Sequence, residues 1–370
     1  MAENKEKKVL NVPNLRFPEF EGEWEICKLS DLCTFFSGGT PNSSNKDFYG
    51  GKIAFIRSGE LHANKTELFV TQKGFESSSA KMVDVGDLLL AMYGATSGDI
   101  AISKIKGAIN QAILCIRTKQ NKKFIESVWN KHVSKILMKY LQGGQGNLST
   151  DIVKSLSFSF PTLAEQERIA KLMALLDERI STQNKIIDKL QSLIKGITQN
   201  IVRYNKANVR LSDCLSCSSS TLQESDVSEH GTYPVYGANG VVGYLDNYNT
   251  ENEAIYIIKD GSGVGSTSYV TGKCSATGTL NILRAKEGYS LQYLYYMLKV
   301  FNFEPYKTGM AIPHIYFKDY GKAKVFCPTY KEQLQYARLL SAIDKRLTVE
   351  HGLLTSLSLQ KQYLLRQMFI

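Results

Sequence analysis

The sequence contains no run of about eighteen apolar residues, the length that a membrane-spanning helix needs. Its first ten residues, MAENKEKKVL, are charged and lack the apolar core of a signal peptide. The seven cysteines are an odd number without regular spacing, which indicates reduced thiols rather than a disulfide framework. These absences argue against a membrane protein and a disulfide-rich secreted domain, and we expect a cytoplasmic protein.

Several catalytic motifs are also missing. No Gly-Lys pair is followed by Ser or Thr, so there is no Walker A loop. The glycine-rich residues 261–265 are followed by a strand-like stretch where a nucleotide-binding loop would start a helix. A DNA methyltransferase acting alone would carry an Asn-Pro-Pro-aromatic motif, which Cys327–Tyr330 resembles only superficially. Cys214 and Cys217 form a lone C-x-x-C, for which packing is favoured over zinc. We expect no catalytic residue and no metal site.

What the sequence does contain is one long amphipathic segment, residues 161–201. Apolar residues recur in it in alternating steps of four and three, with Gln183 as the polar exception. This spacing is typical of the a/d seam of a coiled coil. Pro161 and Thr162 stand where a helix would begin, and Glu165 lies in the first turn, where the helix dipole favours a carboxylate. We predict one helix of about 38 residues, roughly 57 Å long; the alternative is a buried hairpin helix.

The chain repeats this segment 167 residues later, at 328–368. The motif Pro-Thr-x-x-Glu-Gln opens both copies, and Glu350 takes the place of Gln183. A polar seam residue fixes register or partner choice at a cost in stability. The matched pair therefore predicts that the two helices face each other; a pair that does not meet near the centre would instead face a partner or solvent. The apolar seam expected to pair the helices comprises Ile169, Met173, Leu176, Ile180, Ile187, Leu190, Ile194, Leu340, Ile343, Leu347, Leu354, Leu357 and Leu364.

The segments before the two helices are also related. Residues 25–32 are echoed by 209–215, and 87–98 by 254–265, where each copy has a buried-type strand running into a glycine-rich loop. The offset falls from 182 to 167, so the first copy has an early insertion of about 15 residues. We predict a duplicated α+β protein. Its expected parts are a polar lead-in (1–20), a first globe (21–160), a long helix (161–206), a second globe (207–327) and a second long helix (328–370).

In their order, several short motifs resemble the specificity subunit of type I restriction-modification systems. They are Phe36–Pro41, Ile56–Leu61, Gly94–Gly98, Asn110–Ala112 and Tyr233–Gly240, together with the two helix starts. The resemblance implies that each globe is a target recognition domain for one half of a split double-stranded DNA sequence. It also implies that the long helices pair antiparallel and set the spacing. Methyltransferase subunits, two of them and carrying S-adenosylmethionine, would dock on this scaffold, and restriction subunits would complete the nuclease. This chain would bind no cofactor itself.

The second half departs from the family pattern in two places. It has Asp260-Gly261-Ser262-Gly263 where the first half has Tyr93-Gly94-Ala95-Thr96, and it lacks the Asn-Gln-Ala triplet. These differences argue against an equal base preference of the two halves.

The net charge of +10 suits a polyanionic partner, and lysines, arginines, hydroxyls and glycine loops supply the groups that contact DNA. For each lysine the alternative is a solvated surface charge, Tyr93 could instead be a core residue, and His314 a plain loop histidine. A coiled-coil scaffold whose globes bind protein explains the helices but not the charge. The DNA-binding candidates are Arg57, Ser58, Lys65, Lys73, Lys81, Tyr93, Thr96, Ser97, Lys104, Lys106, Tyr236, Asn239, Lys259, Ser262, Ser266, Thr267, Lys273 and His314.

Overall fold

The computed structural model describes residues 10–142, 145–146, 148–309 and 312–370. The chain divides into two compact units. Unit 1 comprises the residues up to Thr182 together with Leu354–Ile370, and unit 2 comprises Gln183–Leu353. Each unit combines β-sheets with helices, so the α+β class predicted from the sequence is confirmed. Each unit also contains part of both long helices.

The long helices are α5 (Leu163–Tyr204) and α9 (Tyr330–Met368). Both begin two residues after the predicted position, and α5 continues three residues beyond its predicted end. At each start the threonine of the Pro-Thr-x-x-Glu-Gln motif accepts a hydrogen bond from the backbone N–H of the glutamate three residues on, at 3.4 Å in both copies. Thr162 and Thr329 therefore act as N-caps, which explains why the motif recurs at both helix starts.

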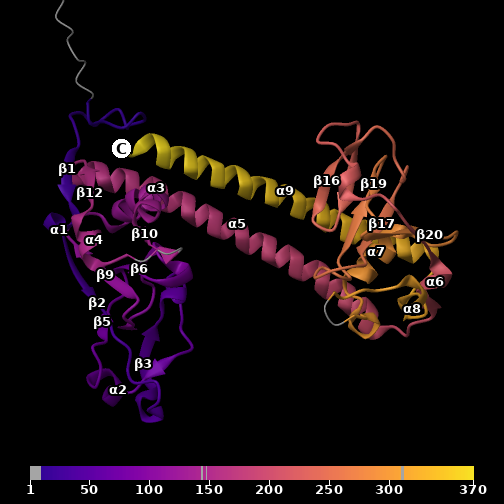
Figure 1. Ribbon diagram of the computed structural model, residues 1–370, viewed down its shortest axis with the longest axis horizontal. Helices are drawn as coiled ribbons and strands as arrows, with labels where there is room; N and C mark the ends of the chain where they lie inside the picture. The colour runs from indigo at the N-terminus through magenta and orange to yellow at the C-terminus, as the bar shows by residue number, and fades with distance from the viewer. Residues whose placement is uncertain (1–9, 143–144, 147, 310–311) are drawn as a thin grey trace, which may run out of the picture. The chain divides into compact units, whose positions relative to one another are not determined.

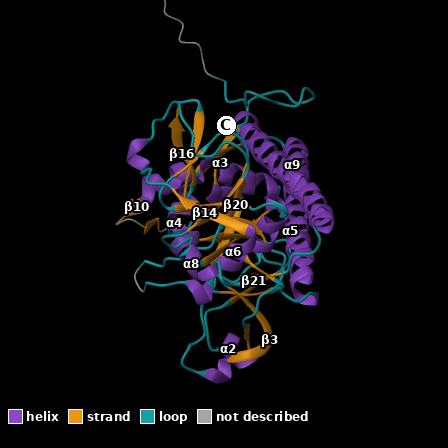
Figure 2. Ribbon diagram, turned by 90° about the vertical axis from the view of Figure 1, so that its right-hand side faces the viewer, coloured by secondary structure: helices purple, strands orange, loops and turns teal. Residues whose placement is uncertain are grey.

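Within each unit the segments of α5 and α9 lie side by side and run antiparallel (Figures 1 and 2). In unit 1 Asp177 forms an ion pair with Lys361 at 2.5 Å, while Met173 and Met368 share one core. In unit 2 the amide of Gln183 donates to the backbone oxygen of Glu350 at 3.0 Å and also to its carboxylate. The two polar seam residues therefore do meet, as the sequence predicted.

Every predicted seam residue on the two helices is buried or half-buried. Ile169, Met173 and Ile187 are among the fully buried ones, whereas Ile186 and Leu193 on the other side of α5 are 37% and 48% exposed. The seam spacing therefore identified the packed face of each helix.

Unit 1 is built on two four-stranded sheets. The first has the order β2-β9-β6-β7 with antiparallel neighbours, and the second has the order β4-β3-β8-β5 with β3 and β8 parallel. The strands are β2 (Cys33–Ser37), β3 (Tyr49–Ile56), β4 (Phe69–Val70), β5 (Lys81–Val83), β6 (Leu88–Ala91), β7 (Ile100–Ile102), β8 (Gly107–Ile109) and β9 (Ile113–Thr118). Helix α3 (Lys122–Tyr140) places Phe124 and Trp129 in a core that also includes residues of both long helices.

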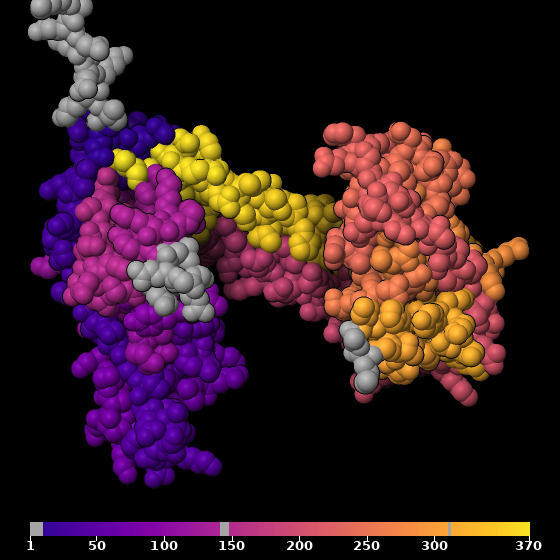
Figure 3. All heavy atoms as spheres, in the orientation of Figure 1, coloured from indigo at the N-terminus to yellow at the C-terminus, as the bar shows by residue number. Residues whose placement is uncertain are grey.

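Besides its 3₁₀ turns, unit 1 contains several smaller elements. They are β1 (Glu25–Lys28), which pairs with β12 (Ser157–Phe160), the short pair β10 (Leu141–Gln142) and β11 (Gln145–Gly146), and helices α1 (Leu29–Leu32), α2 (Gln72–Glu76) and α4 (Thr150–Ser155). Strand β3 and helix α2 lie in a lobe of unit 1 that extends away from the long helices (Figures 1 and 3).

Unit 2 repeats this plan with fewer elements. Its main sheet has the order β14-β20-β17-β18 and its smaller sheet the order β16-β15-β19, with β15 and β19 parallel. The strands are β14 (Leu215–Ser219), β15 (Tyr233–Gly237), β16 (Gly240–Leu245), β17 (Ala254–Ile258), β18 (Thr267–Val270), β19 (Ser275–Ala276) and β20 (Leu280–Ala285). Unit 2 also has α6 (Leu211–Cys214), α7 (Leu291–Lys299), α8 (Phe317–Tyr320), the pair β13 (Val209–Arg210) and β21 (Lys324–Val325), and 3₁₀ turns at Glu224–Asp226 and Glu304–Tyr306.

The duplication inferred from the sequence is present strand by strand. β2 corresponds to β14 at the larger offset, and β6, β7 and β9 correspond to β17, β18 and β20 at the smaller one. The extra residues of the first copy therefore lie between β2 and β6. Unit 1 has β4 and α2 in this stretch, and they belong to its projecting lobe.

The glutamine of the repeated motif has the same structural role in both copies. Gln166 Oε1 accepts a hydrogen bond from the backbone N–H of Asn121 at 3.1 Å, and its amide donates to the Pro161 oxygen at 2.9 Å. Gln333 likewise bonds to the Ser290 N–H and the Pro328 oxygen, both at 2.9 Å. Each glutamine thus ties the start of a long helix to the start of the shorter helix, α3 or α7, that precedes it.

The segment expected to be a polar lead-in has a structural role from residue 10 onward. Arg16 forms two hydrogen bonds of 2.7 Å to Glu165, whose side chain is 1% exposed. The Leu15 N–H donates to the Gln367 oxygen at 2.9 Å. This segment therefore contacts the first turn of α5 and the end of α9 inside unit 1.

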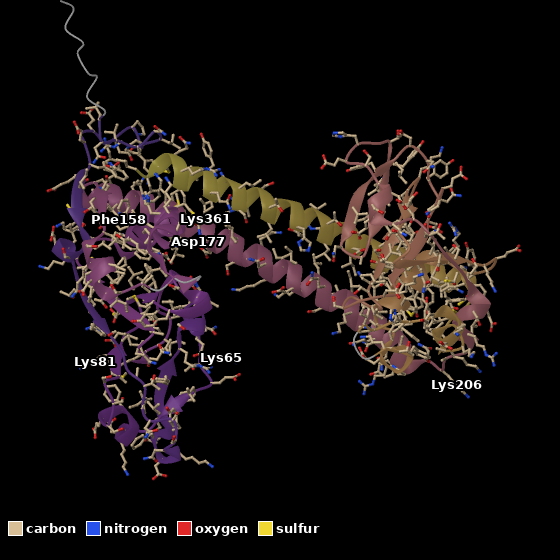
Figure 4. All side chains as sticks on the ribbon, viewed as in Figure 1. Lys65, Lys81, Phe158, Asp177, Lys206 and Lys361 are labelled. Carbon is tan, nitrogen blue, oxygen red and sulfur yellow. The ribbon has the colours of Figure 1, made fainter. Side chains whose placement is uncertain are left out.

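An ion-pair network connects three helices of unit 1. Lys123 of α3 pairs with Glu126 and, at 2.6 Å, with Asp177 of α5, and Asp177 also pairs with Lys361 of α9. Asp177 and Lys361 lie next to each other in Figure 4. Burial of Asp177 opposes its ionisation, but the hydrogen bonds from the two lysines hold the pKa of this carboxyl below its ordinary value.

Candidate nucleic-acid interface

The two glycine-rich loops are hairpin turns with the same backbone hydrogen bonds. In unit 1 the loop joins β6 to β7, and the Gly98 N–H donates to the Ala91 oxygen at 2.8 Å. In unit 2 the loop joins β17 to β18, and the Gly265 N–H donates to the Ile258 oxygen at 2.9 Å. Three further bonds of the first loop recur in the second at the same offset of 167: Ala91 N–H to Asp99, Ser97 N–H to Gly94 and Asp99 N–H to Thr96.

Neighbouring segments hold both loops in the same way. In unit 1 Met92 accepts from the Leu148 N–H at 3.0 Å and donates to the Ala112 oxygen at 2.8 Å. In unit 2 Lys259 accepts from the Ile315 N–H at 2.9 Å and donates to the Thr279 oxygen at 3.0 Å. The backbone arrangement is therefore the same in both copies. Unit 2 differs from unit 1 in its side chains, because it lacks the Asn-Gln-Ala triplet and has a different loop sequence.

Each loop needs two glycines with positive φ, Gly94 and Gly98 in unit 1, and Gly261 and Gly265 in unit 2. A β-carbon at Gly94 or Gly261 would meet nothing within 4 Å, so these two backbone positions are open to close approach. At Gly98 it would lie 2.8 Å from Val133, and at Gly265 2.9 Å from Phe303. One glycine of each loop thus faces outward and the other packs against its unit.

Replacing Gly98 by alanine is expected to destabilise unit 1 by about 2 kcal/mol, because the β-carbon would clash with Val133 at a φ of +86°. Gly94→Ala is the matched control: its φ is +75° but the β-carbon has open space, so we expect a loss of about 1 kcal/mol. Chemical denaturation followed by circular dichroism would measure both. Equal losses would show that the contact with Val133 does not restrict Gly98.

An aspartate of each loop pairs with a histidine from another segment, and neither pair was predicted from the sequence. Asp99 in unit 1 bonds to His62 Nε2 at 2.9 Å, and this hydrogen bond raises the pKa of His62. Asp260 in unit 2 bonds to His314 Nδ1 at 2.7 Å. Of these four residues only His314 was predicted from the sequence, because mainly cationic and hydroxyl side chains were expected to contact DNA. The replacement of Tyr93 by Asp260 was the available signal.

In unit 1 the candidates lie in different surroundings. Arg57 pairs with Glu60 at 3.2 Å, Lys106 pairs with Asp84 at 2.9 Å, and the Ser97 hydroxyl donates to the Met92 oxygen at 3.1 Å within its own loop. Tyr93 is 44% exposed, so it is a surface residue and not part of the core.

The remaining unit 1 candidates do not form a single patch. Lys65 and Lys81 lie on different sides of the unit in Figure 4. Lys104 donates to the His62 oxygen at 3.4 Å, so it lies beside the Asp99–His62 pair. Lys73 is exposed on α2, and Ser58 and Thr96 are half-buried in short 3₁₀ turns. Among these candidates, Tyr93 is the exposed residue closest to the loop in sequence. Lys104 also lies near the loop, because it contacts His62, the partner of Asp99.

In unit 2 the loop candidates Ser262 and Ser266 are exposed, and Lys259 and Thr267 at its base are half-buried. Asn239 is exposed in the turn between β15 and β16. Two other candidates contact aromatic rings. Tyr236 packs edge-on against Tyr256 at 5.8 Å, and the Lys273 ammonium lies 4.8 Å from the Tyr248 ring.

In the described residues no cluster of three or more histidines, cysteines, aspartates or glutamates is arranged to hold a metal ion. No helix of the described part of the chain has the length and apolarity to span a membrane.

Comparison with known proteins identifies similar chains. The model of the type I restriction modification DNA specificity domain matches residues 21–192 and again 205–359. The MjaIX specificity subunit of Methanocaldococcus jannaschii is 25% identical over 182 residues, which cover 45% of this chain and 42% of that protein. The EcoR124I/EcoR124II specificity subunit of Escherichia coli is 24% identical over 200 residues, which cover 51% and 46%. The aligned part of this chain thus spans less than half the length of these relatives.

Solved structures share the fold. The S subunit of a type I restriction-modification system from M. genitalium has a TM-score of 0.70 at 17% identity, covering 97% of this chain and 99% of that one. A chain from a study of the assembly and conformational transition of the type I R-M system has a TM-score of 0.51 at 16% identity, covering 92% and 96%. Both likenesses extend over nearly the whole chain.

Proposed function

This chain belongs to the family of type I restriction modification DNA specificity domains, and from that premise we propose that it is the DNA sequence-recognition subunit of a type I restriction-modification complex. Each unit reads one half of a bipartite double-stranded target. The chain has no catalytic role of its own and binds no cofactor.

The observation that carries this proposal is the pair of hairpin loops. Four backbone hydrogen bonds within each loop and two to neighbouring segments recur in both copies, yet the side chains at equivalent positions differ, as Tyr93 and Asp260 do. A rigid frame that presents different side chains is what two readers of different base sequences require, because base edges are distinguished by side-chain donors and acceptors.

The basic surface supports phosphate contact around these loops. The net charge is +10, and exposed lysines such as Lys65, Lys73 and Lys81 are spread over unit 1 rather than joined into one strip. Such charges attract the duplex without regard to sequence, and their contribution falls with rising salt concentration. Base discrimination would then come from the loops and affinity from the wider surface.

The long helices set the spacing between the half-sites and dock two methyltransferase subunits, which carry S-adenosylmethionine; restriction subunits join the complete nuclease. Their outer faces support this role, because apolar side chains remain exposed there. Apart from the terminal residues Leu163, Tyr204 and Tyr330, those at least 48% exposed are Leu175, Leu193, Leu339, Val349, Leu359 and Tyr363. Apolar residues on the outer face of a paired helix favour a protein partner.

Exchanging residues 21–160 for the equivalent domain of a relative tests the modular reading. We expect methylome sequencing of cells carrying the hybrid to show one half of the target changed and the other intact. The donor domain should supply a backbone N–H for Gln166 and a lysine at the position of Lys123, because both contact α5 across the junction.

The matched control is the same exchange with the parental domain carrying only neutral sequence tags. A hybrid that assembles but changes both halves would contradict the assignment of one half-site to each unit. A parental protein that directs no methylation and shifts no duplex at low salt would contradict the function itself.

A further inference from the structure

Asp260 and His314 form a half-exposed pair beside the first glycine of the unit 2 loop. Their side chains are 36% and 35% exposed, and Asp260 Oδ1 lies 2.7 Å from His314 Nδ1. Asp260 stands at the position that Tyr93 occupies in unit 1, directly before the outward-facing glycine of the loop. The pair is therefore placed where the two loops present different chemistry.

The backbone holds this pair in place without help from the carboxylate. The Gly261 N–H donates to the Pro313 oxygen at 3.0 Å, and Thr308 and His314 exchange two backbone hydrogen bonds of 2.9 and 2.7 Å. The Ile315 N–H adds a bond to the Lys259 oxygen at 2.9 Å. Both partners thus lie on segments that are already fixed, so the pair is preorganised.

Unit 1 provides an internal control for a purely structural role. There the Leu148 N–H donates to the Met92 oxygen at 3.0 Å, as the Ile315 N–H does to the Lys259 oxygen in unit 2. The unit 1 loop closes in the same way with a tyrosine in place of the aspartate. The loop fold therefore does not require a carboxylate at this position. General affinity for DNA does not favour one either, because a carboxylate repels the phosphate backbone.

The hydrogen-bonding capacity of the pair defines what it can recognise. A carboxylate only accepts hydrogen bonds. In the part of the chain that the structure describes, Oδ1 of Asp260 is bonded to His314 and Oδ2 has no partner. In the major groove the bases offer two kinds of donor, the N6 amino group of adenine and the N4 amino group of cytosine, whereas guanine and thymine present acceptors to the same region.

We propose that Asp260, oriented by His314, is a specificity-determining residue that accepts a hydrogen bond from the exocyclic amino group of an adenine or cytosine in the half-site read by unit 2. This inference rests on the proposed function. It states which class of base, one with an exocyclic amino group, a single side chain of unit 2 recognises. The free carboxylate oxygen makes the contact and rejects a guanine or thymine at that position, and the histidine keeps the carboxylate in one orientation.

The experiment uses the full chain, alone and with a methyltransferase subunit, and selects bound sequences from a pool of duplexes randomised over the target. The selected adenines and cytosines are then replaced one at a time by purine or pyrimidin-2-one, which lack the amino group. At one position of the unit 2 half-site we expect about a tenfold loss of affinity for wild type and none for Asp260→Ala. Asp260→Asn keeps the side-chain shape and should relax selection at that same position.

Glu287→Gln is the charge-matched control: it removes an exposed carboxylate of unit 2 between β20 and α7, and selection should remain as in wild type. Unchanged base selection by both Asp260 variants, or equal wild-type affinity for every amino-deleted duplex, would overturn the inference while leaving the proposed function intact. A wild-type protein that selects no sequence at all would instead overturn the proposed function. The analogue series on wild type gives a result even where a variant fails to fold.

Discussion

Ile187→Asp is expected to lower the stability of the paired helices by about 4 kcal/mol and to abolish methyltransferase docking with it. Ile187 is 4% exposed and lies one turn after Gln183, the residue that contacts Glu350 across the helix pair. A carboxylate at that place loses its hydration without gaining a partner. Thermal unfolding followed by circular dichroism measures the first effect, and co-purification with a methyltransferase subunit measures the second.

Ile186→Asp is the matched control, because it puts the same charge on the adjacent residue of the same helix. Ile186 is 37% exposed, so its carboxylate would remain hydrated and the expected loss is below about 1 kcal/mol. Normal stability and normal assembly of the Ile187 variant would show that α5 and α9 do not pair through this seam in solution.

The sequence predicted the helices well because their signals are local. Steps of four and three identify one face of a helix whatever lies opposite, and every seam position turned out buried or half-buried. The helix starts were equally predictable from the sequence, since a threonine cap and the glutamate of the first turn lie within a few residues of each other. The duplication added a second, independent reading of the same pattern.

Contacts between distant segments were not predictable in this way. Arg16 pairs with Glu165 across 149 residues, and Asp177 pairs with Lys361 from the other end of the chain. Nothing in the spacing of these residues distinguishes them from solvated charges, because the fold alone brings them together. The role of Gln166 was hidden for the same reason: the repeated motif was visible, but its partner at Asn121 was not.

The candidate interface was predicted by residue type, and the limits of that approach are visible in single residues. Tyr236 is half-buried against Tyr256, and Lys65 and Lys81 lie on different sides of their unit. Asp260 was passed over because an acidic group does not suit a phosphate. Whether a residue reads bases depends on where the loop presents it, and that follows from the backbone bonds of both hairpins rather than from composition.

Gln183→Leu is expected to lower the midpoint of thermal unfolding by about 8 °C, whereas Gln183→Leu combined with Glu350→Leu should return it close to wild type. The single change removes the amide that donates to the Glu350 carboxylate, a group that is 2% exposed, and leaves it with Arg346 of its own helix. The double change replaces the whole layer by apolar side chains. If the loss in the double variant equals the sum of the losses in the two single leucine variants, the two residues are not coupled.

The pH dependence of the same variants separates this layer from general packing. The hydrogen bond from Gln183 holds the pKa of Glu350 below its ordinary value. A carboxyl with a lowered pKa in the folded state stabilises the fold above its unfolded pKa of about 4.3, and this contribution is lost as the pH falls through the folded value. Wild type should therefore lose part of its stability below about pH 4 that the double leucine variant does not lose. Equal acid sensitivity of the two proteins would assign the loss to other carboxylates.

The position of this layer gives it a consequence beyond stability. Gln183 and Glu350 are equivalent residues of α5 and α9, and their contact within unit 2 pairs the two helices in one register. A slip of the helices by one heptad would leave each polar group against an apolar seam residue, and Gln183 would then face Ile343 or Leu357. The polar layer therefore fixes the register of α5 against α9. In the proposed function that register sets the half-site spacing, so the double leucine variant should stay folded but tolerate targets whose spacing differs from that of wild type, which methylome sequencing would detect.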